Sequence, residues 1–181
     1  MKRMLKQLVC MTAAVLLAVS SFPAAAMASE GFTGEYERLI DMADLLTYEE
    51  ESELLETLNE ISERQKMDIV VITSEDMDGY TDIQEYADDL YDYCDYGYGA
   101  NRDGLLLLIS MEERDWYIST CGYGITAFTD AGISYLGSAM KEDLSSGNYA
   151  SAFHTYAAEC DQLITQAREG HPFSKKDLPH A

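Results

Sequence analysis

Apolar and polar residues follow one another in blocks whose spacing predicts alternating helices and strands. Four apolar residues at helical spacing follow Thr47, which can cap a helix and precedes three glutamates. This pattern predicts a helix from Thr47 to about Lys66. The β-branched run Asp68–Thr73 predicts a short buried strand. Apolar positions between Ile83 and Cys94 return to helical spacing and predict a second helix.

The central part of the chain predicts a β-hairpin between two loops rich in glycine and aspartate. The apolar run Leu105–Ile109 forms the first strand and Trp116–Thr120 the second, and alternation places Trp116 on a core-facing side. In an antiparallel pair, the start of the first strand lies beside the end of the second. The loop that ends at Asp103 must therefore meet the loop that begins at Cys121. Loops held by rigid strands often carry binding residues, so we expect the functional site there.

Two further helical patterns, over 131–144 and 149–168, are separated by a Ser-Ser-Gly-Asn turn. The order of elements predicts an α/β fold, a three-layer α/β/α sandwich with a small mixed sheet that includes the hairpin. One domain is expected over residues 29–170. Residues 171–181 contain two prolines and no periodicity, which predicts a disordered tail.

The first 28 residues predict a secretory signal peptide. A basic start is followed by an apolar segment and by Ala-Met-Ala, which ends at Ala28 and is typical of a cleavage site. The apolar run is short for a bilayer span. We therefore expect cleavage near Ala28, an extracytoplasmic or secreted protein, and no transmembrane anchor in the mature chain.

The charge is strongly negative, which narrows the class of partner. The full chain has a formal charge of −21, and removal of the signal leaves 9 basic against 33 acidic residues, or −24. This field repels phosphate backbones and anionic lipids, so we expect no nucleic-acid partner and an affinity for cations. Most of these carboxylates can equally serve solubility. Three cysteines remain, Cys94, Cys121 and Cys160, and their spacing leaves any disulfide pairing open.

Several segments together resemble the TPM domain family, named after a thylakoid-lumen phosphatase, a photosystem II repair protein and a modulator of levamisole receptors. The segments that carry the resemblance are Ile40–Leu46, Asp68–Thr73, Ile83–Ala87, Asn101–Ile109, Gly122–Gly124 and Thr129–Asp130. The resemblance implies an extracytoplasmic α/β/α domain. In some members it implies a calcium-binding acidic cluster or acid phosphatase activity.

The converging loops supply candidate ligands for calcium, which takes six to eight oxygens. Asp103 and Asp130 flank the hairpin, and Asp95 ends the helix that leads into the first loop. Asp41 and Asp44 join this set only through the family resemblance. The alternative is that Asp44 and Asp130 cap helices and that Asp103 sets a turn.

The same loops carry residues suited to binding a partner. Gly122 and Gly124 leave backbone carbonyls accessible, and Arg102 carries a cation. Aromatic side chains are expected to form a rim over the loops; they are Tyr96, Tyr98, Tyr123 and Phe128.

Two functions remain at this stage. The first is an exported binding module with an acidic calcium site, which engages an unidentified envelope or extracellular protein. The alternative is a metal-dependent acid phosphatase acting on phosphomonoesters, in which Arg102 contacts the phosphate. No residue is assigned as catalytic in either case.

Overall fold

The structure, a computed structural model, describes residues 36–178. Its sheet has the strand order β1-β2-β3-β4. The strands β1, β2 and β3 run parallel, and β4 is antiparallel to β3. Their bounds are Leu39–Asp41 for β1, Asp68–Ser74 for β2, Gly104–Ser110 for β3 and Asp115–Cys121 for β4.

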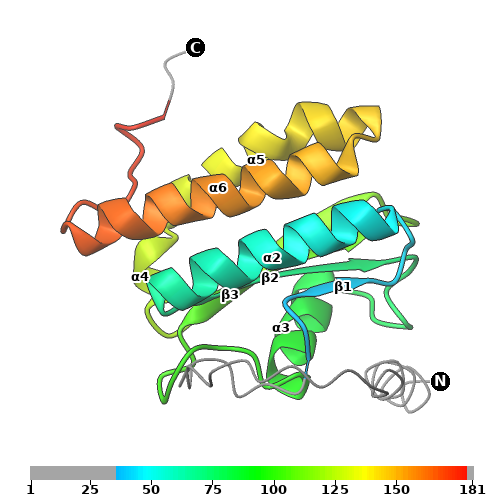
Figure 1. Cartoon of the computed structure of the whole chain (residues 1–181), viewed down its shortest axis with the longest axis horizontal. Coiled ribbons are helices and arrows are strands. Elements are labelled where there is room, and N and C mark those ends of the chain that lie inside the picture. Colours follow the sequence, from blue (N-terminus) through cyan, green and yellow to red (C-terminus); the bar gives the residue numbers. More distant parts are fainter. Residues whose placement is uncertain (1–35, 179–181) are drawn as a thin grey trace, which may run out of the picture.

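Helices cover both faces of this sheet. Their bounds are Tyr48–Gln65 for α2, Ile83–Tyr93 for α3, Gly124–Ala127 for α4, Asp130–Ser146 for α5 and Tyr149–Arg168 for α6. Figure 1 shows α2 between the sheet and α6, and α3 on the opposite side of the sheet. The predicted α/β/α arrangement with a mixed sheet is confirmed.

The alternation of strand side chains divides the core in two. Ile69 and Leu105 point into one cluster, together with residues of α2, α5 and α6. Val70 and Leu106 point into the other cluster, together with residues of α3. Every residue of β2 and β3 is buried, because a central strand covered on both faces has no side exposed to water. Trp116 packs against the first cluster, as alternation predicts, but it is only partly buried.

The two crossover connections have opposite hands. Strands β1, β2 and β3 are parallel neighbours in chain order, so the chain moves across the sheet in one direction. The connecting helices α2 and α3 pack on opposite faces. Two crossovers that advance in the same direction across a sheet, with their helices on opposite faces, must have opposite hands. One of them is therefore left-handed, which is rare.

Local signals account for the element boundaries. The Thr47 hydroxyl accepts a hydrogen bond from the Glu50 N–H at 3.3 Å, and the Glu50 carboxylate accepts one from the Thr47 N–H at 2.8 Å. This capping box starts α2, as the sequence predicts. The strand β1 and the short helix α4 were not predicted, because three or four residues are too few to establish a period.

The segment after α6 differs from the expected disordered tail. Phe173 is 7% exposed and its ring stacks on Tyr135 at 4.9 Å between centroids. Its carbonyl accepts a hydrogen bond from the Thr129 hydroxyl at 2.6 Å. One large apolar side chain thus holds a segment that has no periodicity. Residues 179–181 of the tail lie outside the described residues.

The signal peptide predicted for residues 1–28 also lies outside the described residues. Between residues 36 and 178, no helix combines the length and the apolar character needed to cross a membrane.

Candidate functional site

The two loops beside the hairpin meet, as the sequence predicts. Gly104 at the start of β3 pairs with Cys121 at the end of β4. The Asp103 carboxylate accepts a hydrogen bond of 2.6 Å from the backbone N–H of Tyr123. Tyr98 and Asp103 exchange backbone hydrogen bonds of 2.9 and 3.1 Å, which closes the first loop on itself. A side chain of one loop therefore fixes the backbone of the other.

Two glycines make this close approach possible. Gly122 has φ +57°, and a Cβ placed on it would lie 2.3 Å from Oδ1 of Asp103. A Cβ on Gly124 would lie 2.2 Å from the Gly104 carbonyl oxygen. Real Cβ contacts are much longer, so a side chain at either position would push the loops apart. Both predicted binding glycines serve the packing of these loops.

Arg102 is bound to its own loop on several sides. Its guanidinium donates to the carbonyls of Tyr91 and Tyr96, each at 3.0 Å, and to the Asp92 carboxylate at 2.7 Å. It also lies over the Tyr91 ring at 5.2 Å. Burial alone would lower the pKa of Arg102, but the hydrogen bond and charge of Asp92 outweigh it, so the pKa lies above its usual value. This arginine holds the end of α3 to the loop before β3.

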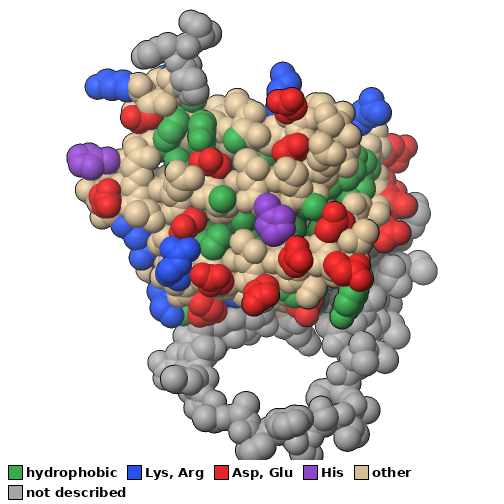
Figure 2. All heavy atoms as spheres, turned by 45° about the horizontal axis from the view of Figure 1, so that its top comes forward, with side chains coloured by type: hydrophobic (Ala, Val, Ile, Leu, Met, Phe, Trp, Pro, Cys, Tyr) green, Lys and Arg blue, Asp and Glu red, His purple; other side chains and the backbone are tan. Residues whose placement is uncertain are grey.

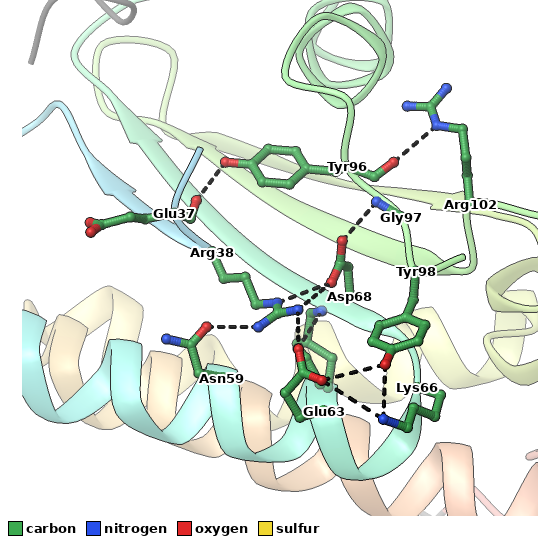
Figure 3. A network of polar contacts seen from close by, with 12 residues as sticks. Glu37, Arg38, Asn59, Glu63, Lys66, Asp68, Tyr96, Gly97, Tyr98 and Arg102 are labelled. Carbon is green, nitrogen blue, oxygen red and sulfur yellow. Dashed lines mark hydrogen bonds and ion pairs between the residues drawn. The ribbon is translucent and has the colours of Figure 1, made fainter. Parts of the chain in front are cut away.

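A buried ion pair lies beneath this loop, and sequence reasoning missed it. Arg38 and Asp68 are 2% and 1% exposed, and the Asp68 carboxylate accepts two hydrogen bonds from the Arg38 guanidinium, at 2.8 and 3.0 Å. Its other oxygen accepts the backbone N–H of Gly97 at 2.8 Å (Figure 3). The signal available was an aspartate at the first position of a strand that is expected to be buried, where a charge needs a partner.

The network extends from Arg38 to the surface of α2. Arg38 also donates to Asn59 at 2.8 Å and to Glu63 at 3.1 Å. Glu63 lies beside the Lys66 ammonium, which donates 2.8 Å to the Tyr98 hydroxyl (Figure 3). The chain of contacts connects the residue before β1, α2, β2 and the loop before β3, so the loop surface is coupled to the core.

The five predicted calcium ligands do not come together. Asp41 pairs with Thr73 near one end of β2, whereas Asp103 precedes Gly104, which pairs with Asp68 at the other end. Strands rise about 3.3 Å per residue, so the two aspartates are separated by roughly 15–20 Å along the sheet. The Asp41 carboxylate accepts hydrogen bonds from the backbone N–H groups of Leu45 and Leu46, each at 2.8 Å, and from the Thr73 hydroxyl.

The remaining three aspartates are exposed. Asp44 and Asp95 lie in loops with φ of 52° and 54°, and Asp95 lies 3.9 Å from the Arg102 guanidinium. Asp130 is the first residue of α5, but the helix is capped by the Thr129 hydroxyl, which accepts from Gly132 at 3.2 Å. Among residues 36–178, no three histidine, cysteine, aspartate or glutamate side chains are grouped so that they could hold a metal ion.

The expected aromatic rim is reduced to two rings. Tyr96 is fully buried and Phe128 is 2% exposed, so both belong to the core. Burial raises the pKa of Tyr96 well above its usual value, and its hydroxyl donates to the Glu37 carbonyl at 2.7 Å. Tyr98 and Tyr123 are half-buried. The Arg168 guanidinium lies 5.9 Å from the Tyr123 ring centre.

Comparison with known proteins identifies the family. The sequence model of the TPM domain matches residues 39–163, which is most of the chain. The chain belongs to the TPM domain family. No curated protein matches this TPM domain significantly in a sequence search.

Solved structures share the fold of this TPM domain. The N-terminal domain of a protein from P. gingivalis has a TM-score of 0.60 and 22% identity, covering 76% of this chain and 87% of that one. The BA42 protein from Bizionia argentinensis has a TM-score of 0.58 and 16% sequence identity, and the match covers 75% of this chain and 90% of that one. The N-terminal domain of cg2496 from Corynebacterium glutamicum has a TM-score of 0.56 and 14% sequence identity, and the match covers 91% of this chain and 99% of that one. At these identities the likeness concerns the fold alone.

Proposed function

We propose that this TPM domain is an exported binding module whose converging loops engage an envelope or extracellular protein. The observation that carries the proposal is the hydrogen bond from the Tyr123 N–H to the Asp103 carboxylate, which locks the two loops together. A surface that is already ordered loses less conformational entropy when it binds a partner. The loops are therefore prepared for binding before any partner arrives.

The charge of this surface favours a basic partner. The side chains of Asp92 and Asp95 are 75% and 78% exposed, and the chain as a whole has a charge of −21. Complementary charge accelerates encounter and selects against acidic partners. The binding that we propose should therefore weaken as the salt concentration rises.

Calcium binding stays a separate proposal, and the positions of the aspartates limit it. Asp103 already accepts a hydrogen bond from the second loop, and Asp95 lies beside the Arg102 cation. A calcium ion at these loops would have to compete with that hydrogen bond and with the Arg102 cation, so we expect weak binding. Calorimetric titration of the purified protein with calcium chloride tests this. Asp103→Asn and Asp130→Asn should each lower the affinity, whereas a tight site unaffected by both would contradict the proposed ligands.

Site-specific photo-cross-linking tests the binding surface. A photoreactive residue placed at Asn101, exposed in the first loop, should cross-link one extracytoplasmic protein in the producing cell. The matched control is Tyr48, which is 81% exposed at the start of α2. Cross-linking to the same protein with equal yield from both positions, or from Tyr48 alone, would contradict the proposal.

The alternative function, a metal-dependent acid phosphatase acting on phosphomonoesters, has weaker support. Its proposed phosphate ligand, Arg102, already binds two carbonyls and the Asp92 carboxylate. Hydrolysis of p-nitrophenyl phosphate by the purified protein, measured with calcium and with chelator, tests it. Calcium-dependent turnover that falls in Arg102→Gln would favour the enzyme over the binding module.

A further inference from the structure

A second candidate site lies at the other end of the β3–β4 hairpin. A half-open cavity of about 830 Å³ separates the turn that joins the two strands from the C-terminal half of α5. Its apolar wall includes Ile109, Met111, Trp116, Leu144 and Tyr149. Pockets of a few hundred to about 1,000 Å³ are typical of sites for small organic molecules.

The shape of this cavity depends on small residues of α5. A Cβ placed on Gly137 would lie 2.4 Å from Cζ2 of Trp116, so the ring lies directly against the backbone of α5. Ser134 and Ser138, one turn apart on the same helix, also line the cavity, and their hydroxyls donate to carbonyls of α5. Short side chains here leave space beside an aromatic ring that is only partly buried.

Two cationic side chains line this cavity. Arg114 and Lys141 are both exposed, and within residues 36–178 neither makes a hydrogen bond or an ion pair through its side chain. The single carboxylate in the lining, Asp115, accepts the N–H of Trp116 at 2.8 Å. The lining therefore has a net charge of +1.

This positive lining contrasts with the rest of the molecule. The chain has 33 acidic and 12 basic residues. Figure 2 shows acidic side chains over much of the face that carries α2 and α6, with basic ones mainly toward its edges. Other basic side chains are bound within the fold, among them Arg38, Arg64, Lys66 and Arg102. Arg114 and Lys141 differ from these, because within residues 36–178 their side chains have no such partner and both line a cavity with one apolar wall.

We propose that this cavity binds an amphipathic organic anion, a small molecule with an aromatic or short alkyl group next to a carboxylate, sulfonate or phosphate. The apolar group lies against Trp116 in the cavity. The anionic group is held at the mouth by Arg114 and Lys141, since charge-assisted hydrogen bonds to an anion are stronger than neutral ones. This site is separate from the loop surface proposed above.

The only tryptophan of the chain makes the proposal measurable. We would titrate the purified protein with 1-anilinonaphthalene-8-sulfonate, an aromatic anion, and with N-phenyl-1-naphthylamine, its uncharged analogue. The anion should bind saturably and quench the emission of Trp116. In the double variant Arg114→Gln/Lys141→Gln its affinity should fall about tenfold or more, because two charge-assisted contacts are lost. The affinity of the uncharged analogue should change little.

Matched variants separate this result from a general loss of charge or of fold. The control Lys175→Gln/Lys176→Gln removes two exposed cations that do not line the cavity, and should bind the anion like the parent. Ser138→Phe fills the cavity and should abolish binding of both probes. Circular dichroism checks that each variant is folded. The proposal is overturned if the double variant binds the anion like the parent, or if saturating anion leaves Trp116 emission unchanged.

Discussion

Two arginines, one at each end of the β3–β4 hairpin, have the same backbone conformation and opposite surroundings. Arg102 and Arg114 have φ of 54° and 53°. The guanidinium of Arg102 is satisfied by two carbonyls and a carboxylate, while within residues 36–178 that of Arg114 has no partner. The first arginine is part of the scaffold, and the second is available to a ligand.

Residue type and position in a loop do not by themselves separate binding groups from structural ones. The sequence suggests Arg102 as the phosphate contact of a phosphatase because it is a cation in the converging loops. The same neighbours that drew attention to it supply its intramolecular partners. A cation left unpaired in a strongly acidic chain is the more specific sign of an external anion.

The largest effect is expected from breaking the scaffold beneath Arg102. Asp68→Asn leaves the buried Arg38 guanidinium without its main counter-charge and weakens the contact to Gly97. Removing one partner of a buried pair costs about 3–5 kcal/mol, and the remaining contacts of Arg38 to Asn59 and Glu63 favour the lower end. Urea unfolding measures this. Asp115→Asn, at the exposed end of the hairpin, is the control and should change stability by less than about 0.5 kcal/mol.

A pair of glycine substitutions compares a crowded position with an open one. Gly122 and Gly147 have φ of 57° and 76°, so alanine is strained at both. Only at Gly122 does the new Cβ also meet Asp103, whereas nothing lies within 4 Å at Gly147, which lines the anion cavity. We expect Gly122→Ala to cost about 2–4 kcal/mol and Gly147→Ala about 1 kcal/mol. Equal losses in thermal or urea unfolding would show that Asp103 moves aside without cost.

The two arginines themselves give the direct test of the comparison. Arg102→Gln removes hydrogen bonds that join α3 to the loop before β3, and since its side chain is 33% exposed we expect a loss of only about 1–2 kcal/mol. Arg114→Gln should be neutral within about 0.5 kcal/mol, because within residues 36–178 its side chain makes no hydrogen bond or ion pair. A destabilising Arg114→Gln would mean that this arginine has a structural role, and the cavity would lose one of its two free cations.

Features that depend on residues close in sequence could be predicted, whereas contacts between residues far apart in sequence could not. The helices and the hairpin were predicted because periodicity, caps and turns act within a few residues, as with Thr47 and Glu50. The meeting of Asp103 with the second loop followed from antiparallel geometry alone. The pair of Arg38 with Asp68, 30 residues apart, depends on which strands are neighbours, and no local pattern reports that. Only the family resemblance grouped Asp41 with Asp103, and in the parallel sheet Asp41 lies at the carboxyl end of β1 whereas Asp103 precedes the amino end of β3.

The smallest effect is expected where Trp116 lies on Gly137. In Gly137→Ala the new methyl group would lie within 2.4 Å of the indole, so the ring must move outward from α5. Crowding costs about 1–3 kcal/mol, and the better helix propensity of alanine returns up to about 1 kcal/mol, which leaves a net loss of about 1 kcal/mol. The emission maximum of this tryptophan should shift to the red as its exposure to water increases. Gly132→Ala in the same helix meets its nearest atom at 3.6 Å and should leave the emission unchanged. A red shift in Gly137→Ala alone would establish that the cavity wall is held by contact between a ring and a helix backbone, in contrast to the hydrogen-bonded loops at the other end of the hairpin.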